Sequence, residues 1–502
     1  MSNFGDGGGN SNTSRRTFIQ RGSAAAAAML GAPALLAAAD SKDDEKQKAE
    51  PQKTDAKAET AKPQAATSAA ATTQNDKLRV VLVGSGGQGR YDMRNLLSCN
   101  QSVVGLCDVD EGQVAKGYQE GGAAIAKAKS YNDYRKLLDD AVLKTFDAVL
   151  IGTPDHWHAP LCRAFIKAGK HVYCEKPLTH SIAEARELRE LARANPKVAT
   201  QMGNQGSAEA SLRRSVELIR AGALGQVHEV HAWLDGGGFP HAMERPHGED
   251  AVPVGFNWDF WCGPSPYRPF KRGIYHPFAW RGWFDFGNGQ LADFTCHIFN
   301  TAMRSLELTY ATRIEVAGTK LGMESYGSTN QLTMHFPARQ GSNPARPLDA
   351  VTVHWYDGGP RPSDEILKDV IQIYKKPPTG GSLIIGEKGI LYSNPWNVGA
   401  LIKLNDDPKL KDVLQHEPTK EIPVTLPRKI SHMQEWVNAC KGQGDAWSDF
   451  DFGGHLTEIG LAGVMTLRLG HEVEWDGQHM KATNAPEADR IIRPEQRRGY
   501  LT

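Results

Sequence analysis

One short segment constrains the fold of this chain more than any other, because it joins a buried strand to a glycine-rich turn. Residues 78–83 are almost all apolar, and residues 84–89 read Gly-Ser-Gly-Gly-Gln-Gly. A helical stretch follows, and a second apolar run over residues 102–107 ends at Asp108. The interval from the glycines to this acid is close to the roughly 20 residues typical of a Rossmann unit. The order of strand, glycines, helix, strand and acid predicts a dinucleotide-binding domain.

The residues of this motif have separate expected tasks. Gly84 permits a tight turn, Gly86 lets the backbone approach a pyrophosphate, and Gly89 allows the helix to pack closely on the strand. Asp108 can accept hydrogen bonds from ribose hydroxyls and would repel a 2′-phosphate, so we expect NAD rather than NADP. Asp110 is expected to be a solvated turn residue. The predicted cofactor contacts in this region are Gly84, Ser85, Gly86, Gly87, Gln88, Gly89 and Asp108.

Two further apolar runs continue the parallel pattern. Residues 146–151 and 170–174 read as buried strands, and each is followed directly by polar residues. In doubly wound sheets, ligands bind beyond the carboxyl ends of the strands. We therefore expect the residues after these two strands to face the cofactor crevice. They are Thr153, Pro154, His158, Glu175 and Lys176.

Composition excludes several classes of protein. The 502 residues suggest two or three domains. The 58 basic side chains balance the 58 acidic ones, which argues against binding nucleic acid or an anionic membrane through a basic surface. Seven cysteines with no C-x-x-C pair argue against a disulfide scaffold or a cysteine-rich zinc site. Asp155, His156 and His158 are close in sequence but lack further ligands at convincing spacing, so no metal is expected.

The first 76 residues are expected to lie outside the fold. Arg15 and Arg16 stand in a Ser-Arg-Arg-x-Phe pattern, followed by a mildly apolar stretch and an A-x-A site that ends at Ala39. Residues 1–39 therefore resemble a twin-arginine signal peptide; an alanine-rich tail with a chance arginine pair is the alternative. Residues 40–76 contain no Val, Ile, Leu or aromatic residue, which predicts a disordered linker. We expect the twin-arginine export machinery to carry the protein to the periplasm or cell exterior.

Three segments carry a family resemblance. Residues 153–158 read Thr-Pro-Asp-His-Trp-His, residues 169–178 read Gly-Lys-His-Val-Tyr-Cys-Glu-Lys-Pro-Leu, and residues 291–297 read Leu-Ala-Asp-Phe-Thr-Cys-His. With the glycine loop, they make the chain resemble the Gfo/Idh/MocA oxidoreductases, the family of glucose–fructose oxidoreductase and inositol dehydrogenase. The resemblance implies an α/β fold with an N-terminal Rossmann doubly wound parallel sheet over residues 77–200. A C-terminal α/β domain with an open, largely antiparallel sheet is implied over residues 201–502, together with a homo-oligomer.

The resemblance assigns catalytic roles to Lys176, Asp293 and His297. Asp293 and His297 are four residues apart, so one helical face can present both to the same pocket. His297 is expected to titrate near neutrality and to transfer a proton, while Lys176 stabilises the developing alkoxide. Plainer alternatives are a surface lysine, a helix cap for Asp293 and a satisfied core histidine for His297.

Further residues are expected around the cofactor and substrate. Asn204, at the domain junction, is predicted to hydrogen-bond the cofactor or substrate, and Arg281 is predicted to pair with the pyrophosphate. Tyr275 and His276 are predicted to contact the substrate. All but Asn204 lie in residues 257–297, a long stretch rich in Trp, Pro and Gly. Such a stretch is either a lid or sugar-facing wall, or a structural aromatic cluster.

Together these features predict an exported NAD(P)-dependent oxidoreductase that acts on a hydroxyl of a sugar or polyol by hydride transfer. Free NAD is scarce outside the cytoplasm, so the cofactor is expected to be tightly bound and regenerated on the enzyme. One alternative is an NAD-dependent glycosidase, in which transient oxidation, elimination, hydration and reduction give net hydrolysis. His241, His247 or Tyr275 would then serve as the added acid/base. Another alternative is a non-catalytic ligand-binding protein.

Replacing Arg15 and Arg16 by lysine should trap the precursor in the cytoplasm, because the arginine pair is the feature that the export machinery reads. The measurement is cell fractionation followed by immunoblotting, with Arg21→Lys as the matched control outside the pair. Equal periplasmic accumulation of the double variant and the wild type would contradict the signal.

Overall fold

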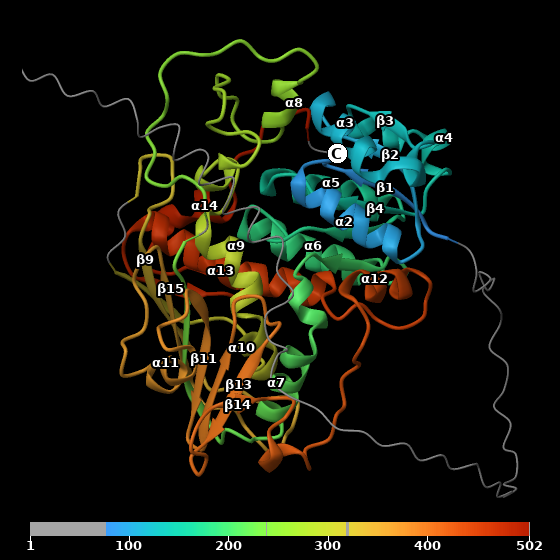
Figure 1. Cartoon of the computed structure of the whole chain (residues 1–502). Coiled ribbons are helices and arrows are strands. Elements are labelled where there is room, and N and C mark those ends of the chain that lie inside the picture. Colours follow the sequence, from blue (N-terminus) through green and yellow to red (C-terminus); the bar gives the residue numbers. More distant parts are fainter. Residues whose placement is uncertain (1–76, 237, 318–320, 501–502) are drawn as a thin grey trace, which may run out of the picture. The chain divides into compact units, whose positions relative to one another are not determined.

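The N-terminal half is built on a six-stranded sheet in the order β3-β2-β1-β4-β5-β6 (Figure 1). This computed structural model describes residues 77–236, 238–317 and 321–500, so the predicted signal peptide and linker lie outside the described residues. Every neighbouring pair of strands is parallel. The strand order reverses between β1 and β4, which creates a crevice at the carboxyl ends of these two strands.

The elements of this half follow one another in βα units. Its strands are β1 (Arg79–Val83), β2 (Ser102–Cys107), β3 (Lys129–Tyr131), β4 (Ala148–Ile151), β5 (His171–Cys174) and β6 (Thr200–Met202). Its helices are α2 (Gly87–Ser98), α3 (Glu111–Gly121), α4 (Asp140–Leu143), α5 (His158–Lys167), α6 (Ile182–Ala194) and α7 (Ala210–Arg220). Nearly every residue of β1 and β4 is buried, because helices cover both faces of a parallel sheet and its strands are apolar throughout.

The C-terminal half is built on a ten-stranded sheet in the order β14-β13-β12-β11-β7-β10-β9-β8-β15-β16. Its neighbouring strands are antiparallel except for the parallel pair β7 and β10. The first five strands in chain order are β7 (Val227–Leu234), β8 (Arg313–Ala317), β9 (Asn330–Phe336), β10 (Val351–Asp357) and β11 (Gly380–Gly386). The others are β12 (Gly389–Ser393), β13 (Ala400–Leu404), β14 (Lys411–Asp412), β15 (Val473–Asp476) and β16 (Lys481–Ala482). The predicted fold class is confirmed.

Helices separate the two sheets. Those of the second half are α8 (Trp258–Cys262), α9 (Gly289–Ile298), α10 (Asn300–Ser305), α11 (Lys368–Tyr374), α12 (His432–Cys440), α13 (Phe450–Leu469) and α14 (Asp489–Ile492). α13 packs along both α6 and α9, and it also contacts β8 and β9. Among the described residues, no helix combines the length and apolarity that a membrane crossing needs. All seven cysteines are free.

The Rossmann core is completed by residues from far along the chain. Met433, Trp436 and Val437 of α12 are buried in the same cluster as apolar residues of β1 and β5. Trp436 stacks edge-on against Tyr173, with ring centroids 5.6 Å apart. The expected domain boundary at residue 200 also falls on the first residue of β6. The Rossmann core is therefore not continuous in sequence, and the domain boundaries expected from the sequence stay a prediction.

Residues 238–288, between β7 and α9, form what we call the aromatic insert. Its core is a buried cluster of rings: Phe256, Trp258, Trp261, Phe270, Tyr275, Trp280, Trp283 and Phe286. In Figure 1 it is the yellow-green segment that carries α8, beside α3 of the Rossmann half. The Glu111 amide donates to the Gly255 carbonyl, and Asp110 and Phe256 form an isolated β-bridge. Of the two interpretations offered by the sequence, the insert is built as a structural aromatic cluster that docks on the β2–α3 loop.

Candidate functional site

The glycine loop follows β1 at the strand-order reversal. Gly84 has φ +90°, and a side chain there would also lie 2.7 Å from the backbone of Gly152. A Cβ on Gly89 would lie 2.0 Å from the Gly84 carbonyl oxygen, so the start of α2 can approach the β1 turn only without a side chain. A Cβ on Gly86, by contrast, would have no protein atom within 4 Å. The backbone is therefore open at the one glycine expected to approach a pyrophosphate.

Asp108 lies beside this loop at the end of β2. Its carboxylate accepts hydrogen bonds from the Ser85 amide at 2.6 Å and from the Asp110 amide at 2.9 Å. Burial raises the pKa of Asp108 to about 6, although both amides oppose the shift. Asp110, expected to be a solvated turn residue, instead caps α3 through the Gly112 amide and pairs with His276 at 2.9 Å.

Glu175 lies at the end of β5 within a buried polar network. Its Oε1 accepts from the side-chain amides of Gln88 at 3.1 Å and Gln205 at 2.8 Å. Burial and the nearby charge of Glu175 raise the pKa of Asp92 on α2 well above its usual range. Asp92 also accepts a hydrogen bond from the Gln88 side-chain amide at 3.4 Å, so Gln88 lies between the two carboxyl groups. This network ties α2 to the strand that carries Lys176, a link that sequence reasoning missed.

Lys176 and Asp293 form an ion pair between the two halves of the protein. Lys176 Nζ donates to Asp293 Oδ1 at 2.7 Å and to its carbonyl oxygen at 2.9 Å. Arg281 Nε lies 3.9 Å from the other carboxylate oxygen. Burial opposes ionisation, yet the charges of Lys176 and Arg281 hold the pKa of Asp293 below its usual value. Asp293 is therefore an anion held between two cations.

His297 lies one helical turn beyond Asp293 on α9 and is only 3% exposed. Burial, together with the charge of Lys176, lowers its pKa to about 3. The expectation that His297 titrates near neutrality is therefore wrong, because the residue type can be read from the sequence but its burial cannot. The imidazole is neutral at physiological pH and can accept a proton.

Trp396, in the turn between β12 and β13, lies against this histidine. The two rings meet edge-on with centroids 4.9 Å apart, and Trp396 also contacts Phe294 at 5.8 Å. It is 39% exposed, which is unusual for a tryptophan. The next residue, Asn397, donates to the His297 carbonyl at 2.8 Å. Sequence reasoning missed Trp396, since nothing in its local sequence links it to α9.

The segment after β4 holds the neighbouring loops in place. His158 contacts the carbonyl oxygens of Pro177 at 2.8 Å and Thr153 at 2.9 Å, so neither ring nitrogen remains for the expected cofactor contact. His156 contacts the carbonyls of Trp261 and Phe286, and Trp157 Nε1 donates to those of Phe260 and Trp261. Pro154 precedes the short 3-10 turn Asp155–Trp157. The aromatic insert therefore docks on a second Rossmann loop.

The start of α9 is fixed by buried amides. Asn288, just before the helix, donates to Asp155 Oδ2 at 3.0 Å and to the Thr179 carbonyl at 3.2 Å. Asn204, after β6, donates to the Cys296 carbonyl at 3.3 Å. These bonds connect α9 to three Rossmann loops and set the position of Asp293 and His297.

Three predicted residues lie elsewhere than expected. Arg281 contacts Asp293, at the β5 end of the crevice and two strands away from the glycine loop, rather than a pyrophosphate position. Tyr275 is 1% exposed within the aromatic cluster, where it borders a separate surface pocket of about 460 Å³ with Arg268. His276 pairs with Asp110 beside Asp108, so it lies at the adenosine end of the crevice. Local sequence could not reveal the path of the insert that places them.

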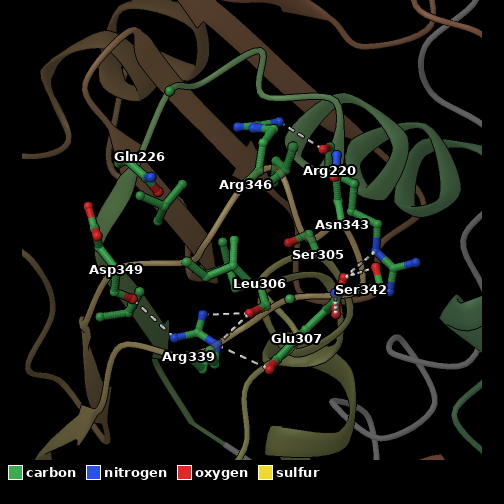
Figure 2. A pocket seen from close by; sticks show the side chains of 16 residues that line it. Arg220, Gln226, Ser305, Leu306, Glu307, Arg339, Ser342, Asn343, Arg346 and Asp349 are labelled. Atoms are coloured by element: carbon green, nitrogen blue, oxygen red, sulfur yellow. Dashed lines mark hydrogen bonds and ion pairs between the residues drawn. The ribbon is translucent and has the colours of Figure 1, made fainter.

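A smaller pocket on the C-terminal half is filled by its own arginines (Figure 2). Arg339 donates to the carbonyls of Leu306, Glu307 and Asp349. Arg346 donates to the Arg220 carbonyl at 2.9 Å. These guanidinium groups secure loops, so this pocket is not a candidate active site.

Unpaired polar atoms in the crevice fit a bound dinucleotide and substrate. Four predicted residues each have a buried atom without a hydrogen-bond partner among the described residues: Ser85 Oγ, Thr153 Oγ1, Asn204 Oδ1 and His297 Nδ1. A buried polar atom left unpaired costs about 1–3 kcal/mol, so a cluster of them indicates a ligand. A proton acceptor, an anion and two cations lie at the β5 end, and this set can stabilise a developing alkoxide.

Comparison with protein families agrees with this geometry. Residues 78–203 match the Gfo/Idh/MocA model described as an oxidoreductase family with an NAD-binding Rossmann fold. Residues 241–338 match the model described as the C-terminal alpha/beta domain of the same oxidoreductase family.

Individual relatives match over part of their length. Inositol 2-dehydrogenase of Salmonella typhimurium is 30% identical over 156 residues, which cover 31% of this chain and 45% of that protein. Myo-inositol 2-dehydrogenase of Thermotoga maritima is 28% identical over 153 residues, which cover 30% of this chain and 43% of that protein. The chain thus spans less than half the length of these relatives.

Solved structures extend the likeness of fold. The aldose-aldose oxidoreductase from Caulobacter crescentus, solved with glycerol, has a TM-score of 0.52 at 16% identity and covers 80% of this chain and 100% of its own. Levoglucosan dehydrogenase, solved with NADH and levoglucosan, has a TM-score of 0.53 at 16% identity. The match covers 80% of this chain and 99% of that protein. At identities this low, the similarity shows a shared fold and does not extend to function.

The variants Gly86→Ala and Gly89→Ala should distinguish a glycine that contacts the cofactor from a glycine that is needed for packing. Gly86→Ala should leave the melting temperature unchanged, because its methyl group meets no protein atom. It should weaken NAD binding about 10–100-fold by blocking a charge-assisted hydrogen bond of about 1.5–3 kcal/mol. Gly89→Ala should lower the melting temperature by several degrees, as expected for overpacking of about 1–3 kcal/mol. Scanning fluorimetry and calorimetry give the two readouts; equal melting temperatures for both variants would refute the assignment.

Proposed function

We propose that this protein is an NAD-dependent oxidoreductase acting on a CH–OH group of a sugar or polyol, because residues 78–203 and 241–338 match the two models of the Gfo/Idh/MocA oxidoreductases. The ion pair of Lys176 with Asp293 is the observation that carries the proposal. It sets a cation and an anion from opposite halves at the carboxyl end of β5, where the Rossmann fold directs its ligands.

The chain's own residues supply proton transfer and charge stabilisation. The glycine loop and Asp108 hold the dinucleotide, whose nicotinamide supplies a two-electron hydride acceptor when bound. His297, whose Nδ1 is buried without a partner among the described residues, accepts the proton of the substrate hydroxyl as the O–H bond breaks. The charge of Asp293 opposes the lowering of the His297 pKa by burial. Lys176 stabilises the negative charge that develops on the oxygen. Asp293 positions the Lys176 ammonium and stabilises the imidazolium that forms.

A sugar or polyol substrate fits the rim of the crevice. Trp396 leaves part of its ring exposed beside His297, and sugars present C–H faces that pack on such rings. The Arg281 guanidinium lies over the rings of Phe278 and Trp280, at 4.5 and 4.2 Å. Aromatic surface next to charged hydrogen-bonding groups is the combination that an amphipathic polyol requires. The names of the inositol, aldose and levoglucosan enzymes among the similar proteins support this substrate class.

We further propose export by the twin-arginine route with NAD retained on the enzyme. The support for export is the Ser-Arg-Arg-x-Phe pattern at residues 14–18. The support for retention is the aromatic insert, which docks both on the β2–α3 loop and on Trp157. A Cβ on Gly263 would lie 2.3 Å from the Trp157 ring, so this contact is close. An insert fixed at two Rossmann loops would hinder the opening that cofactor release needs.

Net glycoside hydrolysis is a second candidate, favoured by the position of His241. His241 contacts the Phe239 ring at 4.7 Å, and Phe239 contacts Phe278 at 6.4 Å, next to Arg281. Its Nδ1 is buried without a partner among the described residues. His247 and Tyr275, the other predicted acid/base residues, border the separate pocket with Arg268. His241 is therefore the residue to test if nitrophenyl glycosides are cleaved.

The purified protein should release NAD on denaturation, and the apo-protein should prefer NAD to NADP. NAD affinity should fall as pH drops through about 6, because burial raises the pKa of Asp108 to about 6 and the protonated carboxyl loses acceptor capacity for the ribose hydroxyls. Asp108→Asn should abolish that pH dependence. Mass spectrometry of the released ligand and calorimetry are the measurements; tighter binding of NADP by the apo-protein would overturn the assignment.

His297→Ala should lower single-turnover hydride transfer by roughly 10²–10⁴-fold while NAD remains bound. Lys176→Ala should also slow the step, and the double variant should lose less than the sum of the two, since the residues act as one unit. Nicotinamide absorbance follows the reaction with a substrate found by screening sugars, polyols and nitrophenyl glycosides. His479→Ala, at a histidine whose side chain is 70% exposed, is the matched control.

Near-wild-type transfer in a folded, cofactor-loaded His297→Ala variant would remove His297 from the mechanism. Lys176 would then be the next base to test, because Tyr275 and His276 lie elsewhere. A protein that binds sugars but never reduces its NAD would instead be a ligand-binding protein.

A further inference from the structure

Three potential metal ligands lie together on the ten-stranded sheet, away from the crevice. They are Glu229 and His231 on β7 and His354 on β10. One ligand atom from each lies within 4.8 Å of the other two. They occupy the outer face of the sheet, because the alternate residues Val230 and Val353 belong to the core that includes α9 and α13. No step of the proposed reaction uses them.

Strand register brings these side chains together. Residues two apart on a strand share a face, so Glu229 and His231 point to the same side. β7 and β10 are parallel neighbours, and His354 pairs directly with His231 across them. The rings stack with centroids 4.9 Å apart and an interplanar angle of 18°. Because both strands lie inside the sheet, the backbone holds the three side chains in a preformed arrangement.

The spacing of the ligand atoms matches a zinc-like ion. His231 Nε2 lies 3.2 Å and His354 Nε2 lies 3.1 Å from Glu229 Oε1. A tetrahedral ion with bonds of about 2.0–2.1 Å has ligands about 3.3 Å apart. Two of the three distances between ligand atoms therefore already suit such an ion. The third distance, between one nitrogen of each ring, is no more than 4.8 Å, and a tilt of the partly exposed His354 side chain would shorten it when an ion binds.

The second nitrogen of each ring is held as in metal-bound histidines. His231 Nδ1 lies 3.3 Å from the Tyr356 hydroxyl, and His354 Nδ1 lies 3.1 Å from Thr333 Oγ1. Partners of this kind orient metal-ligating imidazoles. His231 Nε2, on a residue that is 2% exposed, is buried with no hydrogen-bond partner among the described residues despite its closeness to Glu229. An unpaired buried nitrogen that lies beside a carboxylate, on a ring stacked against a second imidazole, is an observation that a cation would explain.

We propose that Glu229, His231 and His354 bind a divalent transition-metal ion, zinc being the best fit, with the remaining coordination position open to water. Two imidazoles and one carboxylate suit such an ion better than calcium or magnesium, which take oxygen ligands. The site would cross-link β7 to β10, the one parallel pair of the sheet. It departs from the expectation of no metal, which rested on residues 155–158 and their sequence neighbours.

The test uses the chelator-treated protein, produced without a histidine tag, and titrates it with Zn²⁺ by calorimetry and with Co²⁺ by visible absorption. One equivalent should bind, with cobalt d–d bands of a low-coordinate nitrogen–oxygen site, and Zn²⁺ should raise the melting temperature. His354→Gln and Glu229→Gln should abolish these responses. Thr333→Val should weaken binding about 10–100-fold, as loss of a ligand-orienting partner does.

His335→Gln is the matched control. His335 lies on the same face, on β9, and pairs with Glu315 at 2.8 Å, but it is outside the three-ligand group. This variant should bind both ions as the wild type does. Equal affinity of the wild type and a folded His354→Gln variant, or no stoichiometric binding by the wild type, would overturn the proposal and leave a metal-free His–Glu network.

Discussion

The candidate site depends on one buried ion pair that neither half of the protein contains by itself. Lys176 comes from the end of β5 and Asp293 from α9, and their side chains are 15% and 11% exposed. Withdrawing two charges from water is costly unless each keeps close partners. Arg281 on one side and the Asp293 carbonyl on the other supply those partners. Docking of the two halves and assembly of the site are therefore the same event.

The sequence predicted what depends on local pattern. The tasks of Gly84 and Gly89 follow from a strand that turns directly into a helix, and the structure has both glycines in close approaches. The i, i+4 spacing placed Asp293 and His297 on one helix. Burial is not local, however, so the lowered pKa of His297 was missed. The same holds for Trp396, for the Asp92–Glu175 pair and for Glu229, His231 and His354, which only strand pairing or long-range packing brings together.

The aromatic insert explains why its polar residues were misplaced. A stretch rich in tryptophan between a strand and a site-bearing helix suggests a wall over the substrate. Its rings pack mostly on one another instead, and the insert contacts Rossmann loops at Asp110 and Trp157. Its two ends therefore serve different places: His276 lies near the adenosine end of the crevice and Arg281 near Asp293. The charged and aromatic residues of the insert identify it as a functional segment in the sequence. They do not indicate which of its residues lies at which end of the crevice.

The contribution of α12 to the Rossmann core has a consequence for how the protein is made. While a ribosome is still elongating the chain, the apolar residues of β1 and β5 lack Met433, Trp436 and Val437, which are translated last among their partners. The N-terminal half would thus present an unfinished hydrophobic surface for most of synthesis and need protection from aggregation. The packing of this core can therefore be complete only after about residue 437 has left the ribosome.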